Sequence, residues 1–232
     1  RKVTIEKIEL KSFDEDNVVD EGNIILDHQN TSNSKPIKKI GVCMKLTNLF
    51  AATLLSLFAV TASAQTYEVQ NAHTYPSFEA DHMGLSFWRG KFLKTSGKIT
   101  LDRAAKTGTV DIVIDASSID FGHAKMNEHA KGKDMFIVEK FPTVSYKSSA
   151  LKFDGDKLVS MDGEMTMMGV TKPLKLTVNH FKCMMHPVFK REICGADASG
   201  TFDRADYGLT YGIPRFSPEI KLAIQVEAVI AD

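Results

Sequence analysis

The chain has 232 residues, with 29 Lys and Arg balanced by 29 Asp and Glu, and 43% of its residues are hydrophobic. The balanced charge excludes the broad basic surface that nucleic-acid binding requires, so no nucleic-acid partner is expected. The length and the apolar content suffice for one domain with a substantial core.

Residues 1–43 are polar and highly charged, and they show little sustained periodicity. Within them, Asp27–Pro36 has the composition of turns and loops. We predict that residues 1–43 are a disordered upstream or non-native extension and that Met44 is the native start. A genuine cytoplasmic extension is the alternative.

Residues 44–64 carry the parts of a secretory signal peptide: a positive charge, an apolar run over Leu49–Val60, and the small-residue pattern Ala62–Ala64. The apolar run is shorter than the about 20 residues that a membrane-spanning helix needs. We therefore predict cleavage between Ala64 and Gln65 and a soluble, periplasmic mature protein. Transient contact with a membrane is compatible with this prediction.

The predicted mature domain, residues 65–232, alternates apolar and polar residues, a pattern typical of β-strands. In Thr109–Asp115, for example, Val110, Ile112 and Ile114 share one face. Strands are predicted at Tyr67–Asn71, Ser77–His82, Phe87–Leu101, Thr109–Asp115, Thr143–Lys147, Lys157–Met167, Leu174–Asn179, Gly195–Phe202 and Lys221–Ala228. Turn residues between them indicate hairpin connections.

One connection, Ser117–Pro142, lacks the alternation and contains a predicted short helix around Ala124–Lys131. About eight or more strands with one helical insertion predict an all-β, antiparallel β-barrel. A sandwich is the alternative. Closure of a barrel removes exposed strand edges, and at about eight strands the interior can hold one small ligand.

Aromatic side chains gather around the first hairpins and the helical connection, in greater number than a small core needs. The aromatic residues predicted to line or border a ligand site are Phe78, Phe87, Phe121, Phe136, Phe141 and Tyr146. Nearby methionines would adapt such an apolar cavity to a flexible ligand. For any single aromatic residue, ordinary barrel core is the competing interpretation.

Two histidines, His82 and His129, lie in the same regions and are predicted to orient the polar head of a ligand. Structural hydrogen bonding at strand ends is the alternative. The motifs of common hydrolases, metalloproteases and phosphate-binding loops are absent, so no catalytic residue, metal or cofactor is predicted. A rival hypothesis is an enzyme acting on a lipid or quinone, with one of these histidines as acid or base.

Cys183 and Cys194 are the cysteines of the predicted mature domain. In an oxidising compartment such a pair predicts a disulfide, here at the base of a hairpin. The alternative is a metal or redox stress protein, because Cys183 and His186 have a C-x-x-H spacing and Met184 and Met185 are soft ligands that suit copper.

Four stretches carry a family resemblance. They are Asn71–Gly97, which contains HMGLS and GKF, followed by His123–Tyr146, Gly163–Pro173 and Asp203–Gly208. On these motifs the domain resembles the YceI family from about Tyr67 to Ala231. The resemblance implies a periplasmic, lipocalin-like barrel that binds and carries a long isoprenoid lipid, such as a prenyl quinone or polyprenyl pyrophosphate, in its interior. For the oligomeric state, a monomer and a homodimer are both compatible with the sequence.

Overall fold

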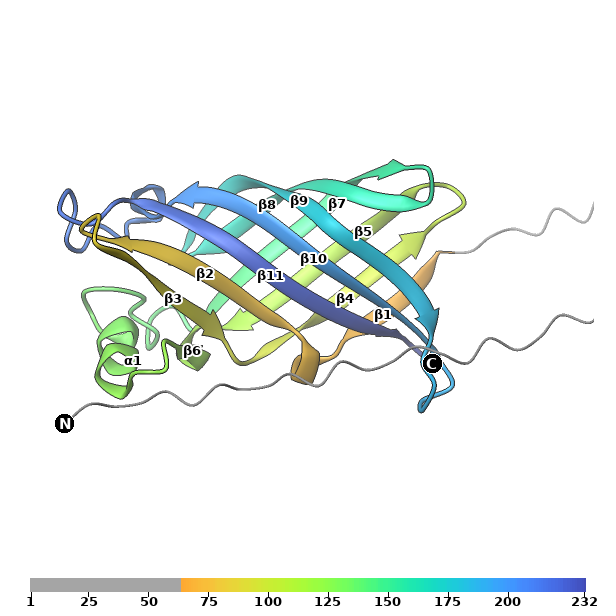
Figure 1. Ribbon diagram of the computed structural model, residues 1–232, viewed down its shortest axis with the longest axis horizontal. Helices are drawn as coiled ribbons and strands as arrows, with labels where there is room; N and C mark the ends of the chain where they lie inside the picture. Colours follow the sequence, from red (N-terminus) through yellow and green to blue (C-terminus); the bar gives the residue numbers. More distant parts are fainter. Residues whose placement is uncertain (1–63) are drawn as a thin grey trace, which may run out of the picture. The chain divides into compact units, whose positions relative to one another are not determined.

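The computed structural model describes residues 64–232 (Figure 1). The predicted extension, residues 1–43, and the predicted signal peptide up to residue 63 lie outside the described residues. Ala64 and Gln65, which flank the predicted cleavage site, are both exposed, and the first strand begins at Gln65. No helix in the described part of the chain is long and apolar enough to cross a membrane.

The described residues form eleven strands, one α-helix and three short 3-10 helices. The strands are β1 (Gln65–Val69), β2 (Tyr75–His82), β3 (Ser86–Phe92), β4 (Thr95–Asp102), β5 (Thr107–Asp115), β6 (Ile119–Asp120), β7 (Thr143–Asp154), β8 (Lys157–Met167), β9 (Val170–Met185), β10 (Glu192–Asp203) and β11 (Glu219–Ile230). The helices are η1 (Asn71–His73), η2 (Ala116–Ser118), α1 (Ala124–Lys131) and η3 (Arg204–Tyr207). The helix α1 has the bounds that the sequence predicts.

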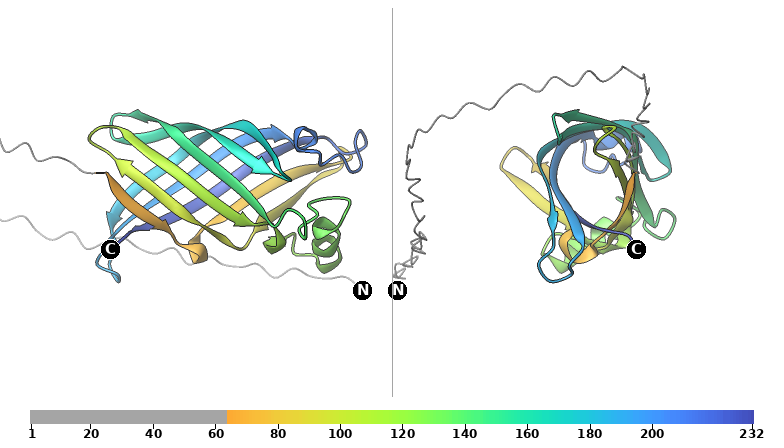
Figure 2. Two further views of the ribbon diagram at one scale, coloured as in Figure 1. Left: turned by 180° about the vertical axis from the view of Figure 1, so that it is seen from behind. Right: turned by 90° about the vertical axis from the view of Figure 1, so that its right-hand side faces the viewer.

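Eight of the strands form a closed antiparallel ring in the order β1-β4-β5-β7-β8-β9-β10-β11. The ring closes because β1 pairs with β4 on one side and with β11 on the other: Tyr67 lies opposite Ile99 and opposite Ile230. The right-hand view of Figure 2 looks along this ring. The predicted all-β, lipocalin-like antiparallel barrel is confirmed, and the sandwich alternative is excluded.

The period-two alternation explains which side chains face the interior. In β5, Val110 and Ile114 are buried, whereas Asp111 and Val113 are exposed. Burying a side chain of this size contributes about 1.5–3 kcal/mol, so each strand gains stability from its inward face. Most buried residues of the ring strands form one large cluster around the barrel axis, and a smaller cluster lies at one end of it.

The predicted single strand Phe87–Leu101 is wrong, because the chain breaks between β3 and β4. The backbone N–H groups of Leu93 and Lys94 donate to Ser118, at its carbonyl oxygen (3.1 Å) and its Oγ (3.0 Å). The short helix η1 separates β1 from β2, and both of these strands pair with β11. The β2–β3 hairpin therefore lies beside the closed eight-strand ring: β2 pairs with β11, and β3 pairs with β2 and with β6.

The two ends of the barrel consequently differ (Figure 1). One end, called the helix end, is bordered by α1, η3, the β2–β3 turn and the connection over residues 208–218. The other end, called the hairpin end, carries the β4–β5 and β7–β8 turns and the long β9–β10 hairpin. These two names are used throughout.

Candidate functional site

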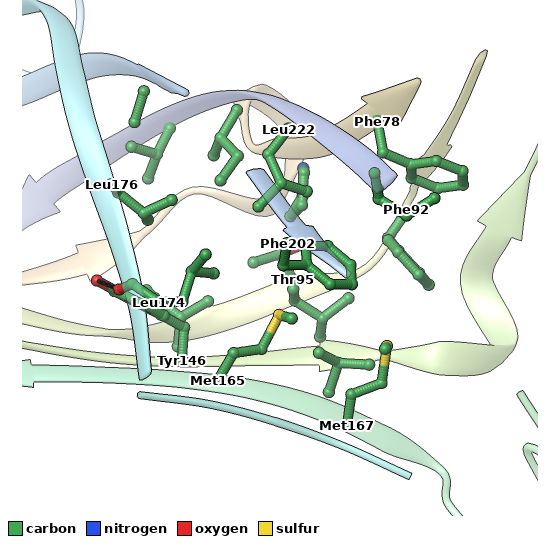
Figure 3. Close-up of a pocket in the computed structure, with 18 of the residues that line it drawn as sticks. Phe78, Phe92, Thr95, Tyr146, Met165, Met167, Leu174, Leu176, Phe202 and Leu222 are labelled. Carbon is green, nitrogen blue, oxygen red and sulfur yellow. Dashed lines mark hydrogen bonds between the residues drawn. The ribbon is translucent and has the colours of Figure 1, made fainter. Parts of the chain in front are cut away.

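The barrel encloses a cavity of about 440 Å³ whose wall is almost entirely apolar. Its volume lies within the roughly 300–1,000 Å³ of small-molecule sites. Residues of its central wall include Phe78, Phe92, Tyr146, Met165, Met167, Leu174, Leu176, Phe202 and Leu222. Figure 3 shows these side chains pointing from separate strands into one shared space. The arrangement suits an elongated apolar ligand.

Most of the ligand-site residues predicted from the sequence lie on the wall of this cavity. They are Phe78, His82, Phe121, His129, Phe136 and Tyr146. Phe87 lies outside the wall, because Trp88 and Phe92 occupy the inner face of β3. Its side chain is 48% exposed, and the Lys221 Nζ lies 5.6 Å from its ring centroid. Phe141 also lies outside the wall and packs on the β8–β9 turn at Gly169.

An aromatic cluster forms the cavity wall towards the helix end. Phe78 meets Phe121 edge-on, with ring centroids 5.5 Å apart, and Phe92 meets Phe136 in the same way at 5.7 Å. Gly90 makes this contact feasible: a Cβ at Gly90 would lie 2.6 Å from Phe78 Cζ and 3.1 Å from the Phe121 ring. The glycine in the G-x-F motif therefore has a packing role at the site.

Both predicted histidines lie among aromatic rings at the helix end. His82 packs against Trp88 and Phe216, with ring centroids 5.5 Å and 5.3 Å away, and His129 meets the ring of Tyr211 at 4.9 Å. Neither imidazole forms a hydrogen bond with another residue between 64 and 232. Among the described residues neither is paired with a carboxylate, as an oriented general base would be, so within residues 64–232 their ring nitrogens are available to a ligand.

Arg204 is a wall residue that the sequence did not predict. Its side chain is 7% exposed. The Nη1 group donates to the Leu209 carbonyl oxygen at 2.7 Å, and the Nε group donates to the Ser217 carbonyl oxygen at 3.4 Å. Burial lowers the pKa of the guanidinium, and the negative charge of Asp203 opposes this shift. Because an arginine stays charged at neutral pH, it gives the helix end of the cavity a positive potential.

Few other polar atoms reach the wall, and most of them are already bonded. The Tyr146 hydroxyl donates to the Leu174 carbonyl oxygen at 3.1 Å, and burial raises the pKa of this tyrosine well above its usual value. The Thr74 Oγ1 bonds the backbone of Glu227. The Thr95 Oγ1, where β4 begins, is buried and has no hydrogen-bond partner among the described residues, so it is available to a ligand.

A second buried cluster closes the cavity towards the hairpin end. It consists of Tyr67, Leu101, Cys194 and Ala228. The Tyr67 hydroxyl lies within hydrogen-bonding distance of Gln65 Oε1 (2.9 Å) and Glu192 Oε2 (3.2 Å). Arg103 holds the same Glu192 carboxylate at 2.6 Å. His82, His129 and Arg204 thus lie on the wall towards the helix end, and a mainly apolar cluster closes the hairpin end.

The predicted disulfide between Cys183 and Cys194 is present, and the two cysteines lie directly opposite each other on β9 and β10. Bonded sulfurs do not offer the thiolate that the alternative metal site requires. The His186 Nδ1 already accepts the backbone N–H groups of Val188 (3.2 Å) and Phe189 (3.1 Å). The C-x-x-H spacing therefore belongs to a cross-linked hairpin.

Residues 67–228 match the model of the YceI-like domain. The chain belongs to this family. Proteins named YceI from Salmonella arizonae and Salmonella enteritidis are 30% identical over 187 residues, which cover 78% of this chain and 97% of theirs. The sequence resemblance to the YceI family is thereby confirmed.

Solved structures share the barrel fold at low sequence identity. Burkholderia cenocepacia BcnA is 22% identical with a TM-score of 0.57, covering 68% of this chain and 98% of its own. The Campylobacter jejuni YceI protein is 24% identical with a TM-score of 0.55, covering 66% and 90%. A polyisoprenoid-binding domain from Saccharophagus degradans is 15% identical with a TM-score of 0.54, covering 72% and 99%.

Proposed function

We propose that this protein is a non-catalytic carrier or storage protein of the periplasm that holds a long isoprenoid lipid in its barrel. The observation that carries the proposal is the apolar cavity inside the barrel, with His82, His129 and Arg204 on its wall towards the helix end and an apolar cluster at the hairpin end. The fold shared with a polyisoprenoid-binding domain supports the same ligand class. A prenyl quinone and a polyprenyl pyrophosphate both have the required apolar tail and polar head.

The apolar wall would supply most of the binding free energy. Each buried methylene is worth about 0.8 kcal/mol, so one five-carbon isoprene unit offers roughly 3–4 kcal/mol before costs. Ordering the flexible tail takes back part of this gain. Met165 and Met167 suit such a ligand, because an unbranched thioether side chain adapts to irregular shapes. Affinity is therefore expected to rise with tail length.

The polar head would lie at the helix end, near His82, His129 and Arg204. The imidazole nitrogens and the guanidinium can donate hydrogen bonds to a quinone carbonyl or to a phosphate oxygen. Their aromatic neighbours would exclude water around such a bond. The head would be oriented by few contacts, and the tail would fill the cavity towards Tyr67.

The periplasmic location is part of the proposal and rests on three observations. Residues 44–64 have the pattern of a signal peptide. The fold begins at Gln65, directly after the predicted cleavage site, and that site is exposed. A structural disulfide is typical of an oxidising compartment. Sequencing the N-terminus of the exported protein tests the location: a first residue other than Gln65 would contradict the predicted cleavage.

The ligand proposal is tested by blocking the cavity. Met165→Trp places an indole in the middle of the lumen, whereas Val113→Trp adds the same group to the outer face of β5. We expect native mass spectrometry to detect an added long-chain prenyl quinone on the unchanged protein and on the Val113→Trp control. The Met165→Trp protein should lose most of this binding while keeping its circular dichroism spectrum.

Two outcomes would contradict the proposal. One is that the unchanged protein holds neither a prenyl quinone nor a polyprenyl pyrophosphate of the same tail length. The other is that Met165→Trp binds the quinone as well as its control does. Turnover of the added quinone that is lost in His129→Ala, while binding persists, would instead support the lipid-modifying enzyme.

A further inference from the structure

The tip of the β9–β10 hairpin lies at the hairpin end (Figure 1). It exposes large apolar side chains. They are Met184, Met185, Val188 and Phe189. Val188 is 75% exposed and Phe189 is 51% exposed. A cluster of this kind on a water-facing turn indicates contact with an apolar partner.

This tip has a defined conformation. The imidazole of His186 stacks on the ring of Phe189, with centroids 4.2 Å apart and planes 16° from parallel. The backbone N–H of His186 donates to the Arg191 carbonyl oxygen at 2.8 Å. The backbone N–H of Lys190 donates to the His186 carbonyl oxygen at 3.0 Å. The Cys183–Cys194 disulfide fixes the base. The apolar side chains are therefore presented by an ordered turn.

The apolar surface surrounds the tip. Met184 and Met185 are successive residues of β9, so their side chains point to opposite faces of the hairpin. Val188 and Phe189 extend this surface over the turn itself. A flat protein surface would cover only one face of the hairpin. A lipid layer that the tip enters would cover both faces and the turn.

Positive charges lie directly behind the apolar tip. Lys182 and Lys190 are exposed, and neither forms an ion pair with any residue from 64 to 232. The acidic Glu192 of the same hairpin is held by Arg103, and Arg191 pairs with Asp232 at 3.0 Å. Between residues 182 and 192 of the hairpin, the unpaired charge is therefore positive, as an anionic phospholipid surface requires.

We propose that the β9–β10 tip inserts into the interfacial layer of an anionic lipid bilayer and attaches the barrel to the membrane by its hairpin end. The apolar tip would lie below the headgroups, and the two lysines would lie at the level of the phosphates. The helix end, with His82, His129 and Arg204 on the cavity wall, would face away from that surface. This contact is independent of which lipid, if any, the cavity holds.

The first test measures binding to vesicles. The protein is purified in the form that the cell makes, so every variant shares the same N-terminal segment. We expect cosedimentation with vesicles of phosphatidylcholine and phosphatidylglycerol, and weaker binding to phosphatidylcholine alone. Val188→Ser/Phe189→Ser should weaken binding at least about tenfold, because two apolar side chains no longer enter the lipid. The control Leu85→Ser, at an equally exposed position of the helix end, should leave binding unchanged.

The second test reads the orientation of the bound protein. The single tryptophan of the chain, Trp88, lies at the helix end, so brominated lipids should not quench it in the unchanged protein. Phe189→Trp should add a fluorescence component that these lipids do quench. Lys182→Gln/Lys190→Gln should remove the preference for anionic vesicles and reduce the sensitivity of binding to salt.

Several results would overturn the proposal. The first is an absence of vesicle binding. The second is an equal loss of vesicle binding in Leu85→Ser and in Val188→Ser/Phe189→Ser. The third is quenching of Trp88 by brominated lipids without quenching of the tryptophan in Phe189→Trp. A dimer in analytical ultracentrifugation that Val188→Ser/Phe189→Ser dissociates, without any vesicle binding, would assign the tip to a second copy of the chain and would also overturn it.

Discussion

The hairpin end and the helix end of the barrel are built from the same chain in opposite ways. At the hairpin end, the ring closes through β1 and β11, Tyr67 is buried in an apolar cluster, and a disulfide joins β9 to β10. At the helix end, the β2–β3 hairpin has left the ring, and short contacts with β6 and α1 complete the wall. The hairpin end is therefore held by ring closure and a cross-link, whereas the helix end is completed by short contacts beside the histidines and Arg204 of the cavity wall.

Removing the disulfide should have the largest effect on stability. We expect Cys183→Ala/Cys194→Ala to lower the free energy of unfolding by about 2–4 kcal/mol, because the unfolded hairpin gains conformational freedom. Urea denaturation measures this loss. Binding of a prenyl quinone to the folded variant should persist, because the helix end is untouched. Equal stability with and without the cross-link would show that strand pairing alone holds the hairpin end.

A methyl group added at Gly90 should disturb the helix end. Gly90→Ala would force Phe78 and Phe121 apart, since the new Cβ would overlap with Phe78. We expect a loss of about 1–3 kcal/mol in the free energy of unfolding and weaker quinone binding. The matched control is Gly195→Ala near the hairpin end, where the nearest atom to a new Cβ lies at 3.7 Å. Similar losses in both variants would argue against a special role for the aromatic cluster.

Replacing a tyrosine by phenylalanine should change the free energy of unfolding differently at the two ends of the barrel. Tyr67→Phe removes a hydroxyl that contacts Glu192 and should cost about 0.5–1.5 kcal/mol of unfolding free energy. Tyr207, in η3 at the helix end, has a buried hydroxyl with no partner among the described residues. Tyr207→Phe should therefore leave stability unchanged or raise it slightly. Thermal denaturation of both variants provides the comparison, and a larger loss for Tyr207→Phe would contradict it.

The alternation of apolar and polar residues predicts most of the ring, because each ring strand has one face towards an apolar interior. The bounds of β8 and of α1 agree with the sequence prediction residue for residue. The break after Phe92 was not predictable in this way. It depends on hydrogen bonds from Leu93 and Lys94 to Ser118, which lies 24 positions beyond Lys94 in the sequence.

The cavity wall was harder to predict than the strands. Residue type alone does not distinguish Phe87 from its neighbour Trp88, because both are aromatic; only the register of β3 with β2 places Trp88 inside. A charged residue directly after a strand, such as Arg204, is usually solvent-exposed. It is buried here because the connection to β11 folds over it and supplies carbonyl acceptors, which is a tertiary effect.

The pairing of β1 with β11 has a consequence for how the chain folds. It joins the first and last strands, and the contact between Thr74 and Glu227 beside it spans 153 positions. Closing so long a loop carries a large entropic cost before any contact repays it, so such topologies fold slowly, in milliseconds to seconds. The ring can close only after the chain has been synthesised through Ile230, and until then the edges of β1 and β10 that pair with β11 are exposed to pairing with other chains.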